Sequence, residues 1–268
     1  MPKIRLDLLL TGQGHVETRT QAQAVIMSGV VFLDGKRLDK PGTLVPEDAQ
    51  PEIRGERMPY VSRGGLKLEK ALASFDISPA GKCCIDCGAS TGGFTDCLLQ
   101  NGSVKVYAVD VGYGQLDWRL RQDERVVVLE RTNVRHLTPE ELIVEDDARI
   151  VPQLAAIDLS FISLRLVLPA IRDLLAEDGE AIALIKPQFE AGREQVGKKG
   201  VVRDPAVHRQ VLEAFLQDAT AAGFGVQAID FSPIKGPEGN IEYLGHLKKG
   251  TPNAPDIDIP AIVASSHM

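Results

Sequence analysis

The sequence contains no long hydrophobic run. The ~18 consecutive apolar residues of a membrane-spanning helix are never reached, because Asp158 and Arg165 interrupt the most apolar region, residues 154–168. The N-terminal Met-Pro-Lys-Ile-Arg-Leu-Asp also lacks the apolar core of a signal peptide. We therefore expect a cytoplasmic protein that does not have a membrane as a partner.

Cysteine and histidine are scarce, and their spacing argues against a metal site. Cys84 and Cys87 have the C-x-x-C spacing of a zinc or redox motif, but Cys83 and Cys97 do not form a second pair with ligand spacing. The five histidines are scattered along the chain. Because free cysteines behave as small buried hydrophobic residues, we predict four buried thiols and no metal.

An overall excess of positive charge, which would favour nucleic-acid binding, is also absent. The net charge is −7, but residues 138–180 hold ten acids and three bases and so account for all of it. The remainder of the chain is neutral and contains basic stretches. Since the acidic segment can lie on a face away from RNA, the net charge neither excludes nor supports RNA binding.

What the sequence does contain is a glycine-rich turn between two apolar runs. Residues 83–87 lead into a turn with three glycines, and a helix-like run covers residues 94–100. A strand, turn and helix of this kind let a ligand approach bare backbone. The next apolar run ends on Asp110, 22 positions after Gly88 (88 to 110), close to the ~20 expected for an acid that binds a ribose hydroxyl. The predicted binding residues are Asp86, Gly88, Ala89, Ser90, Thr91, Gly92, Gly93, Phe94 and Asp110.

The pattern of this turn favours S-adenosylmethionine (SAM) over a dinucleotide. A dinucleotide fingerprint reads G-x-G-x-x-G, and its second glycine admits the pyrophosphate. Ser90 occupies that position here, and D-x-G-x-S-x-G-G resembles the first motif of SAM-dependent methyltransferases. The charged methionine end of SAM suits Asp86, and its ribose suits Asp110. An NAD-dependent dehydrogenase and an ordinary glycine turn without a ligand are the alternatives.

Strand-like and helix-like runs alternate after Asp110. The predicted strands are 126–129, 154–157, 181–185, 224–231 and 241–247, and the predicted helices are 162–175 and 206–222. This alternation predicts an α/β fold of the Rossmann-like methyltransferase type, with a mostly parallel seven-stranded sheet and helices on both faces. Gly88, Asp110, Asp158 and Lys186 each follow a strand, so we expect them at the carboxyl edge of the sheet, where such folds bind ligands.

Residues 1–54 predict a separate, small α+β domain. Two short helical runs precede a strand-like run at 30–33, and Asp34-Gly35 predicts a hairpin turn after it. With Arg19 ahead of the second helix and SGVVFLDGKRLDKPG after it, this segment resembles the S4 RNA-binding domain. A generic α/β cap is the alternative. Residues 55–60 are predicted to be a linker.

Four further motifs extend the resemblance to nearly the whole chain. They are VSRGGLKL at 61–68, IDCGASTGGFTDCLL at 85–99, ALIKPQFEAGREQVGKKGVVRDP at 183–205 and GPEGNIEYL at 236–244. Together with the S4-like start, they resemble the TlyA (hemolysin A) family of ribosomal RNA 2′-O-methyltransferases, whose catalytic domain is of the FtsJ/RrmJ type. The resemblance implies a SAM-dependent methyltransferase domain over 61–250, a C-terminal tail over 251–268, and ribosomal RNA within ribosomal subunits as the partner.

The resemblance also implies a catalytic Lys-Asp-Lys-Glu tetrad, which motif matching assigns to Lys67, Asp158, Lys186 and Glu242. A ribose 2′-hydroxyl is a poor nucleophile near neutral pH, so the enzyme must align it with the methyl donor and ease its proton away. On this reading Lys186 is the base or the electrostatic activator, Asp158 positions it, and Lys67 and Glu242 complete the network. Ordinary surface ion pairs are the alternative for each residue. Lys70, one helical turn after Lys67 and outside the motif, is expected to be a solvated lysine.

RNA contacts are expected from basic residues of the S4-like segment, of the motif at 61–68 and of the loop at 192–199. They are Arg5, Arg19, Lys36, Arg37, Lys40, Arg63, Arg193, Lys198 and Lys199. Two other functions stay open from the sequence. One is a non-catalytic RNA-binding ribosome assembly factor that keeps SAM as a structural ligand, and the other is a membrane-active hemolysin.

Overall fold

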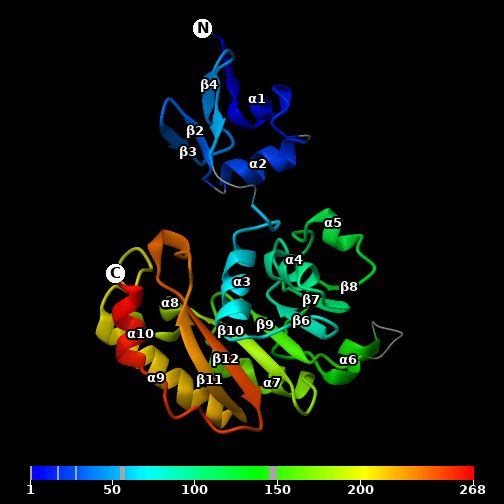
Figure 1. Cartoon of the computed structure of the whole chain (residues 1–268), viewed down its shortest axis with the longest axis vertical. Coiled ribbons are helices and arrows are strands. Elements are labelled where there is room, and N and C mark those ends of the chain that lie inside the picture. Colours follow the sequence, from blue (N-terminus) through cyan, green and yellow to red (C-terminus); the bar gives the residue numbers. More distant parts are fainter. Residues whose placement is uncertain (1, 17, 28, 55–57, 145–149) are drawn as a thin grey trace. The chain divides into compact units, whose positions relative to one another are not determined.

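The chain divides into two compact units, Met1–Arg63 and Gly64–Met268. The computed structural model describes residues 2–16, 18–27, 29–54, 58–144 and 150–268, and Figure 1 labels their elements. Residues 55–57 of the predicted linker lie outside the described residues.

In its described residues, the smaller unit combines two helices with five short strands. Helices α1 (Leu6–Gly12) and α2 (Arg19–Met27) share a core that includes Leu10 and Ile26. The strands are β1 (Lys3–Arg5), β2 (Val31–Leu33), β3 (Lys36–Leu38), β4 (Leu44–Pro46) and β5 (Glu52–Ile53). β1 pairs with β4, and β2 pairs with both β3 and β5, all antiparallel. Asp34 and Gly35, with φ of 50° and 75°, form the turn between β2 and β3, as an Asp-Gly pair favours.

The larger unit is built on a seven-stranded sheet in the order β11-β12-β10-β9-β6-β7-β8. The five strands from β10 to β8 in this order are parallel, whereas β12 runs antiparallel to both β10 and β11. The predicted mostly parallel, seven-stranded sheet is therefore confirmed. The strands are β6 (Cys83–Cys87), β7 (Lys105–Val109), β8 (Val126–Leu129), β9 (Leu154–Ile157), β10 (Glu180–Ile185), β11 (Phe224–Phe231) and β12 (Tyr243–Lys249).

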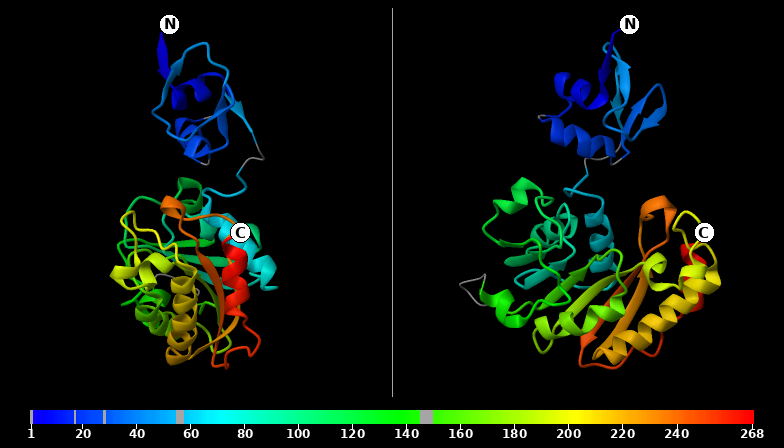
Figure 2. Two further views of the ribbon diagram at one scale, coloured as in Figure 1. Left: turned by 90° about the vertical axis from the view of Figure 1, so that its left-hand side faces the viewer. Right: turned by 180° about the vertical axis from the view of Figure 1, so that it is seen from behind.

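Helices cover both faces of this sheet (Figure 2). Side chains alternate along β6, so Ile85 enters the core shared with Ile171 and Leu212, whereas Asp86 points to the opposite layer and contacts Thr95. The α-helices are α3 (Gly64–Ser74), α4 (Gly93–Gln100), α5 (Trp118–Arg121), α6 (Pro139–Val144), α7 (Leu168–Leu174), α8 (Pro187–Glu190), α9 (Pro205–Ala221) and α10 (Ile259–Ser266). The 3-10 helices are η1 (Leu164–Leu166), η2 (Arg193–Gln195) and η3 (Pro237–Gly239).

Two predicted elements differ from the structure by more than a single residue at an end. The helix predicted over 162–175 is divided into η1 and α7, and Pro169 lies in the first turn of α7, where a missing backbone N–H is tolerated. The strand predicted over 241–247 begins instead at Tyr243, so Glu242 lies immediately before β12.

The C-terminal segment contributes to the core of the larger unit. Asp258 caps α10 by accepting a hydrogen bond from the backbone N–H of Ala261. Ile259 and Val263 of α10 belong to the same hydrophobic cluster as Phe215 of α9. The tail predicted over 251–268 therefore includes a packed helix.

The four cysteines are buried thiols, and burial raises the pKa of the Cys84 thiol to about 11. Among the described residues, no helix is long and apolar enough to cross a membrane. The same residues contain no cluster of three His, Cys, Asp or Glu side chains that could hold a metal ion.

Candidate active site

The turn after β6 has a backbone conformation that glycine adopts easily. Gly88 has a φ of 95°, and a Cβ atom added there would lie 2.5 Å from the backbone oxygen of Asp158. The N–H groups of Gly88 and Ala89 both donate to the carbonyl of Val109, at 2.8 and 3.1 Å. Gly92, with a φ of 97°, precedes α4. The turn therefore requires glycine at position 88, because a side chain there would collide with the backbone of Asp158.

Asp110 connects this turn to the end of β7. One carboxylate oxygen accepts a hydrogen bond from the backbone N–H of Ser90 at 2.8 Å, and the other accepts from Gly112 at 2.6 Å. Each carboxylate oxygen has more than one acceptor site, so Asp110 retains capacity for the hydroxyls of a ribose. In the rest of the turn, Ser90 and Thr91 are exposed, and Ala89, Gly93 and Phe94 are buried.

Asp86 lies between β6 and the first turn of α4. Its side chain is fully buried, and Oδ2 accepts hydrogen bonds from the backbone N–H and the hydroxyl of Thr95, at 2.8 and 2.7 Å. Burial, together with the charges of Asp158 and Asp110, raises the pKa of Asp86 to about 7. Asp86 therefore holds the first turn of α4 against β6. Its second oxygen, Oδ1, has no hydrogen-bond partner, and its role at the charged methionine end of SAM stays a prediction.

The four residues of the predicted tetrad form two ion pairs. Lys67 Nζ lies 2.6 Å from Glu242 Oε2, and Lys186 Nζ lies 2.5 Å from Asp158 Oδ1. Three of these side chains are almost completely buried, and Asp158 is 22% exposed. Lys186 also donates to the hydroxyl of Ser160 at 3.0 Å. The alternative of ordinary surface ion pairs therefore does not fit this geometry.

The strand order brings these pairs to neighbouring positions. Ile185 pairs with Tyr243 across the antiparallel β10 and β12, so Lys186 and Glu242 are the next residues beyond this pair. Asp158 follows β9, which lies between β10 and β6, and its N–H donates to the carbonyl of Cys87 at 2.9 Å. The ion pairs consequently lie along the same carboxyl edge as the glycine turn.

Buried acceptors without partners are found at this edge. Among the described residues, three buried side-chain oxygens have no hydrogen-bond partner: Asp86 Oδ1, Gln188 Oε1 and Glu242 Oε1. Gln188 lies two residues after Lys186, and Glu242 Oε1 lies 2.2 Å from the position of a Cβ atom added at Gly236. Since buried acceptors are normally satisfied, each of these three oxygens lacks a donor that the described residues do not supply.

An exposed phenylalanine beside the tetrad was not identified from the sequence. Phe161, three residues after Asp158, is 91% exposed and has a φ of 64°. Its ring lies 5.1 Å from that of Phe189, three residues after Lys186. Glu190 fixes the adjoining loop by accepting hydrogen bonds from the Ser163 hydroxyl and the Leu164 N–H. The only available sequence signal was the position of Phe161 shortly after a strand-end acid.

Lys70 is not the solvated lysine that the sequence predicts. Its ammonium donates to the carbonyl oxygen of Phe231 at 2.5 Å and lies 3.0 Å from Asp230 Oδ2. It also lies 3.9 Å from the centre of the Phe231 ring. Lys70 therefore joins α3 to the end of β11.

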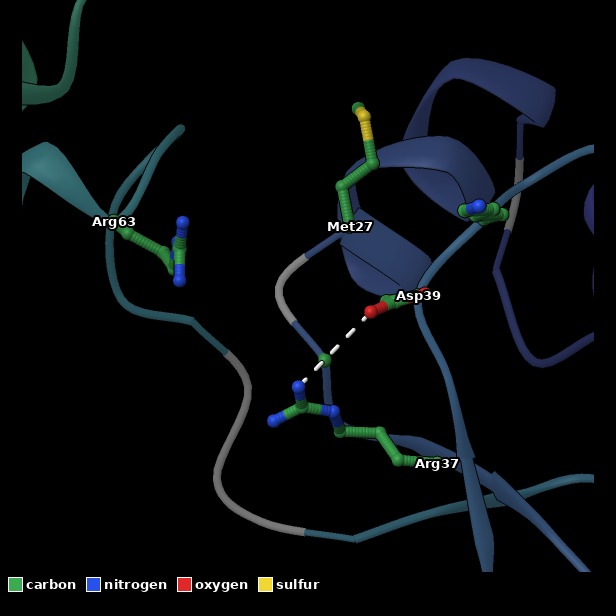
Figure 3. A pocket seen from close by; sticks show the side chains of 6 residues that line it. Met27, Arg37, Asp39 and Arg63 are labelled. Carbon is green, nitrogen blue, oxygen red and sulfur yellow. Dashed lines mark ion pairs between the residues drawn. The ribbon is translucent and has the colours of Figure 1, made fainter. Parts of the chain in front are cut away.

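The predicted RNA-binding residues of the smaller unit form two groups. Arg5 and Arg19 both pair with the buried Asp7, at 2.9 and 3.0 Å, and the Arg5 guanidinium, despite burial of the acid, holds the pKa of the Asp7 carboxyl well below its usual range. The second group lines a pocket of about 370 Å³, and Figure 3 shows the side chains around it. Arg37, Lys40 and Arg63 line it with Met27, Gly29 and Asp39. Lys36 is exposed on β3.

The remaining basic candidates lie in the loop between α8 and α9. Arg193, Lys198 and Lys199 are all exposed. Hydrogen bonds from Gly197 N to Val201 O and from Gly200 N to Gly197 O close a turn that carries the two lysines. Asn240 fixes this turn by donating to the carbonyl of Gly200.

Two family models match the chain. The FtsJ-like methyltransferase model matches residues 60–249, and the S4 domain model matches residues 4–50. The chain belongs to the FtsJ-like methyltransferase family. The predicted family, methyltransferase class and fold are therefore confirmed, and the S4 model lies within the smaller unit.

Close relatives cover nearly the full length of this FtsJ-like chain. It is 52% identical to YqxC of Bacillus subtilis over 99% of this chain and 94% of that protein. It is 44% identical to the 16S/23S rRNA (cytidine-2′-O)-methyltransferase TlyA of Mycobacterium tuberculosis over 94% and 92%. A solved structure from Streptococcus thermophilus is 49% identical with a TM-score of 0.78, covering 100% of this chain and 96% of that one.

Proposed function

We propose that this chain transfers the methyl group of SAM to the 2′-hydroxyl of a ribose in ribosomal RNA. The observation that carries the proposal is the pair of closely spaced ion pairs, Lys67–Glu242 and Lys186–Asp158, at the sheet edge that also holds the glycine turn. Four charged groups in largely buried ion pairs suit a reaction in which a neutral hydroxyl must become an oxygen nucleophile.

The turn after β6 and Asp110 would hold the methyl donor. The bare backbone around Gly88 and the exposed Ser90 would accommodate the nucleoside, and Asp110 would accept hydrogen bonds from its ribose. SAM supplies a methyl group on a sulfonium that is already activated for transfer. Activation of the hydroxyl is consequently the task of the protein.

Lys186 is placed to activate the hydroxyl. An ammonium has three N–H donors, and Asp158 and Ser160 take two of those on Lys186. The third would be directed at the ribose oxygen. There it would stabilise the negative charge that develops as the hydroxyl proton passes to solvent water and the methyl group moves from the sulfonium to the oxygen. In this ion-paired form Lys186 acts as an electrostatic activator, and it becomes a base only if it first loses its own proton.

The S4 domain supports an RNA substrate, and the relative from Mycobacterium tuberculosis indicates its type. That protein is named for cytidine 2′-O-methylation of both 16S and 23S rRNA. We propose cytidine riboses of rRNA within ribosomal subunits as the substrate, which implies a cytoplasmic site of action. The exposed basic residues of the S4 domain and of the loop at 192–199 would contact phosphates.

The test is transfer of a tritiated methyl group from SAM to separated ribosomal subunits, followed by mapping of the methylated ribose. We expect label in rRNA with the wild-type chain and a loss of at least ~10²-fold with Lys186→Ala, the lower scale for a group that assists proton transfer. Lys186→Arg distinguishes an electrostatic activator from a base, because arginine keeps the positive charge but does not deprotonate. Unlabelled rRNA with the wild-type chain would favour a non-catalytic assembly factor. Wild-type activity of Lys186→Ala would reject the assignment of Lys186.

A further inference from the structure

Three polar side chains on one face of α3 contact the β11–β12 pair. Lys67, Lys70 and Ser74 follow one another at spacings of three and four residues, which places them on one side of a helix. Lys67 contacts Glu242 just before β12, whereas Lys70 contacts Asp230 and the carbonyl of Phe231 at the end of β11. Ser74 donates to the same Asp230 carboxylate at 3.1 Å.

The end of β11 is directly connected to the backbone of Glu242. Phe231 pairs with Tyr243 in the register of the two strands, and the N–H of Ser232 donates to the carbonyl oxygen of Glu242 at 2.8 Å. The segment that Lys70 holds therefore adjoins the residue that Lys67 must meet.

The first turn of α3 has a low intrinsic helix propensity. The helix begins with Gly64 and Gly65, and glycine is a poor helix former. Lys67 lies in this turn and must meet Glu242 through a long, flexible side chain. Burial of Leu68 and Leu72 keeps α3 on the sheet, but apolar contacts are non-directional and do not by themselves fix the helix along β11.

We propose that Lys70 is a positioning residue for methyl transfer: by clamping α3 to Asp230 and Phe231, it keeps Lys67 aligned with Glu242. This inference rests on the proposed function, because it holds that the alignment of Lys67 with Glu242 serves methyl transfer. A contribution to stability alone is the competing explanation. An ion pair that is about one quarter exposed on both sides contributes little to stability, so a large effect on catalysis would distinguish the two.

The chain offers a matched control at the opposite edge of the same sheet. Lys82, just before β6, pairs with Glu180 at the start of β10, and their side chains are 29% and 21% exposed. The Lys70–Asp230 pair is 25% and 27% exposed. Lys82→Met therefore removes an ion pair of similar exposure that is distant from the carboxyl edge.

The experiment uses the full chain with separated ribosomal subunits and tritiated SAM, and compares Lys70→Met, Lys70→Arg and Lys82→Met. We expect Lys70→Met to lower kcat about tenfold, the scale of a small misplacement of reacting groups, with KM for the subunits and SAM affinity unchanged. Lys70→Arg should recover most of the loss because it keeps the charge. Lys82→Met should retain wild-type kcat. Wild-type kcat in Lys70→Met, failure of arginine to rescue, or an equal loss in Lys82→Met would overturn the proposal.

A second measurement does not depend on activity. Hydrogen exchange, read by mass spectrometry on the peptide that covers residues 64–74, should be faster in Lys70→Met than in the wild type and unchanged in Lys82→Met. Unchanged exchange in Lys70→Met would overturn the clamp even if wild-type rRNA methylation were undetectable. If Lys186→Ala is inactive while Lys70→Met is fully active, the clamp is wrong and the proposed function stands. If Lys186→Ala is active, the assignment of Lys186 to catalysis is wrong, whatever Lys70→Met shows.

Discussion

Lys67 and Glu242 form an ion pair of 2.6 Å although 175 positions separate them in the sequence. The glutamate is 1% exposed and the lysine side chain 11%. Neither charge is therefore well hydrated, and each depends on the other. Their contact links the first turn of α3 to the residue that precedes β12, on the edge where Lys186 and Asp158 also meet.

Glu242→Gln should consequently be destabilising as well as inactivating. The amide has the shape of the carboxylate but leaves the Lys67 ammonium without a counter-charge, and breaking a buried ion pair costs about 3 kcal/mol or more. Urea unfolding should show a loss of that order. Glu180→Gln, which breaks the more exposed pair with Lys82, should cost under about 1 kcal/mol. Equal losses in the two variants would show that burial of Glu242 does not govern its contribution.

Gly88→Ala tests the glycine turn. Two effects oppose the substitution: a φ of 95°, and a Cβ position 2.5 Å from the backbone oxygen of Asp158. Gly81 supplies the control, since its φ is 74° but nothing lies within 4 Å of its Cβ position. Calorimetry should show at least ~10-fold weaker SAM binding for Gly88→Ala, equivalent to ~1.4 kcal/mol, and wild-type affinity for Gly81→Ala. Unchanged affinity in Gly88→Ala would place the donor pocket elsewhere.

The sequence was sufficient to predict the sheet because its strands are short apolar runs, each followed by a polar or glycine residue. Parallel strands that are buried on both faces have this pattern, and residues such as Asp110 and Lys186 then had to lie at the carboxyl edge. The tetrad could be selected only through motif resemblance. Lysines and acids are common on surfaces, and spacing alone does not show that Lys67 meets Glu242.

Side-chain environments were less predictable, because they depend on contacts between distant segments. The contact of Asp86 with the first turn of α4, for example, depends on the alternation of side chains along β6 and on the position of Thr95. Lys70 looked like a solvated lysine because Asp230, its partner, is 160 positions away (70 to 230). The exposure of Phe161 depends on a left-handed backbone conformation, which no sequence pattern around it indicated.

Asp86→Asn should change how stability depends on pH. In the folded chain, burial raises the pKa of Asp86 to about 7, whereas an unfolded aspartate titrates near ~3.9. Because the raised pKa favours the protonated form in the folded state, the stabilisation is complete below about pH 4 and is lost as the pH rises to about 7. Asparagine does not titrate and can still accept from Thr95.

Urea unfolding of the wild type and of Asp86→Asn should therefore be compared at several pH values. The stability of the variant relative to the wild type should increase between about pH 4 and pH 7 and level off above this range. If the difference in the free energy of unfolding between the two proteins is constant across this pH range, Asp86 titrates at the same pH in the folded and unfolded chains. Asp123→Asn is a control for an aspartate on the surface, because the Arg125 guanidinium lowers the pKa of Asp123.

Phe161→Ala should weaken methyl transfer without weakening the fold. The ring is 91% exposed and its closest aromatic neighbour is Phe189 at 5.1 Å, so its removal exposes little new apolar surface. A large hydrophobic side chain held in water beside the proposed catalytic residues is placed to stack on a nucleotide base. Base stacking on an aromatic side chain contributes ~1–3 kcal/mol, which corresponds to ~5–150-fold in affinity.

Steady-state kinetics on ribosomal subunits should show this loss mainly in kcat/KM for RNA, with SAM affinity and the melting temperature unchanged. Val104→Ala is the control, because Val104 is 50% exposed and precedes β7 at the opposite edge of the sheet. Phe161→Leu separates stacking from simple burial, since leucine offers apolar surface without an aromatic face. If leucine restores the wild-type kcat/KM, the contact is hydrophobic rather than aromatic. If alanine already has the wild-type value, Phe161 does not contact the substrate.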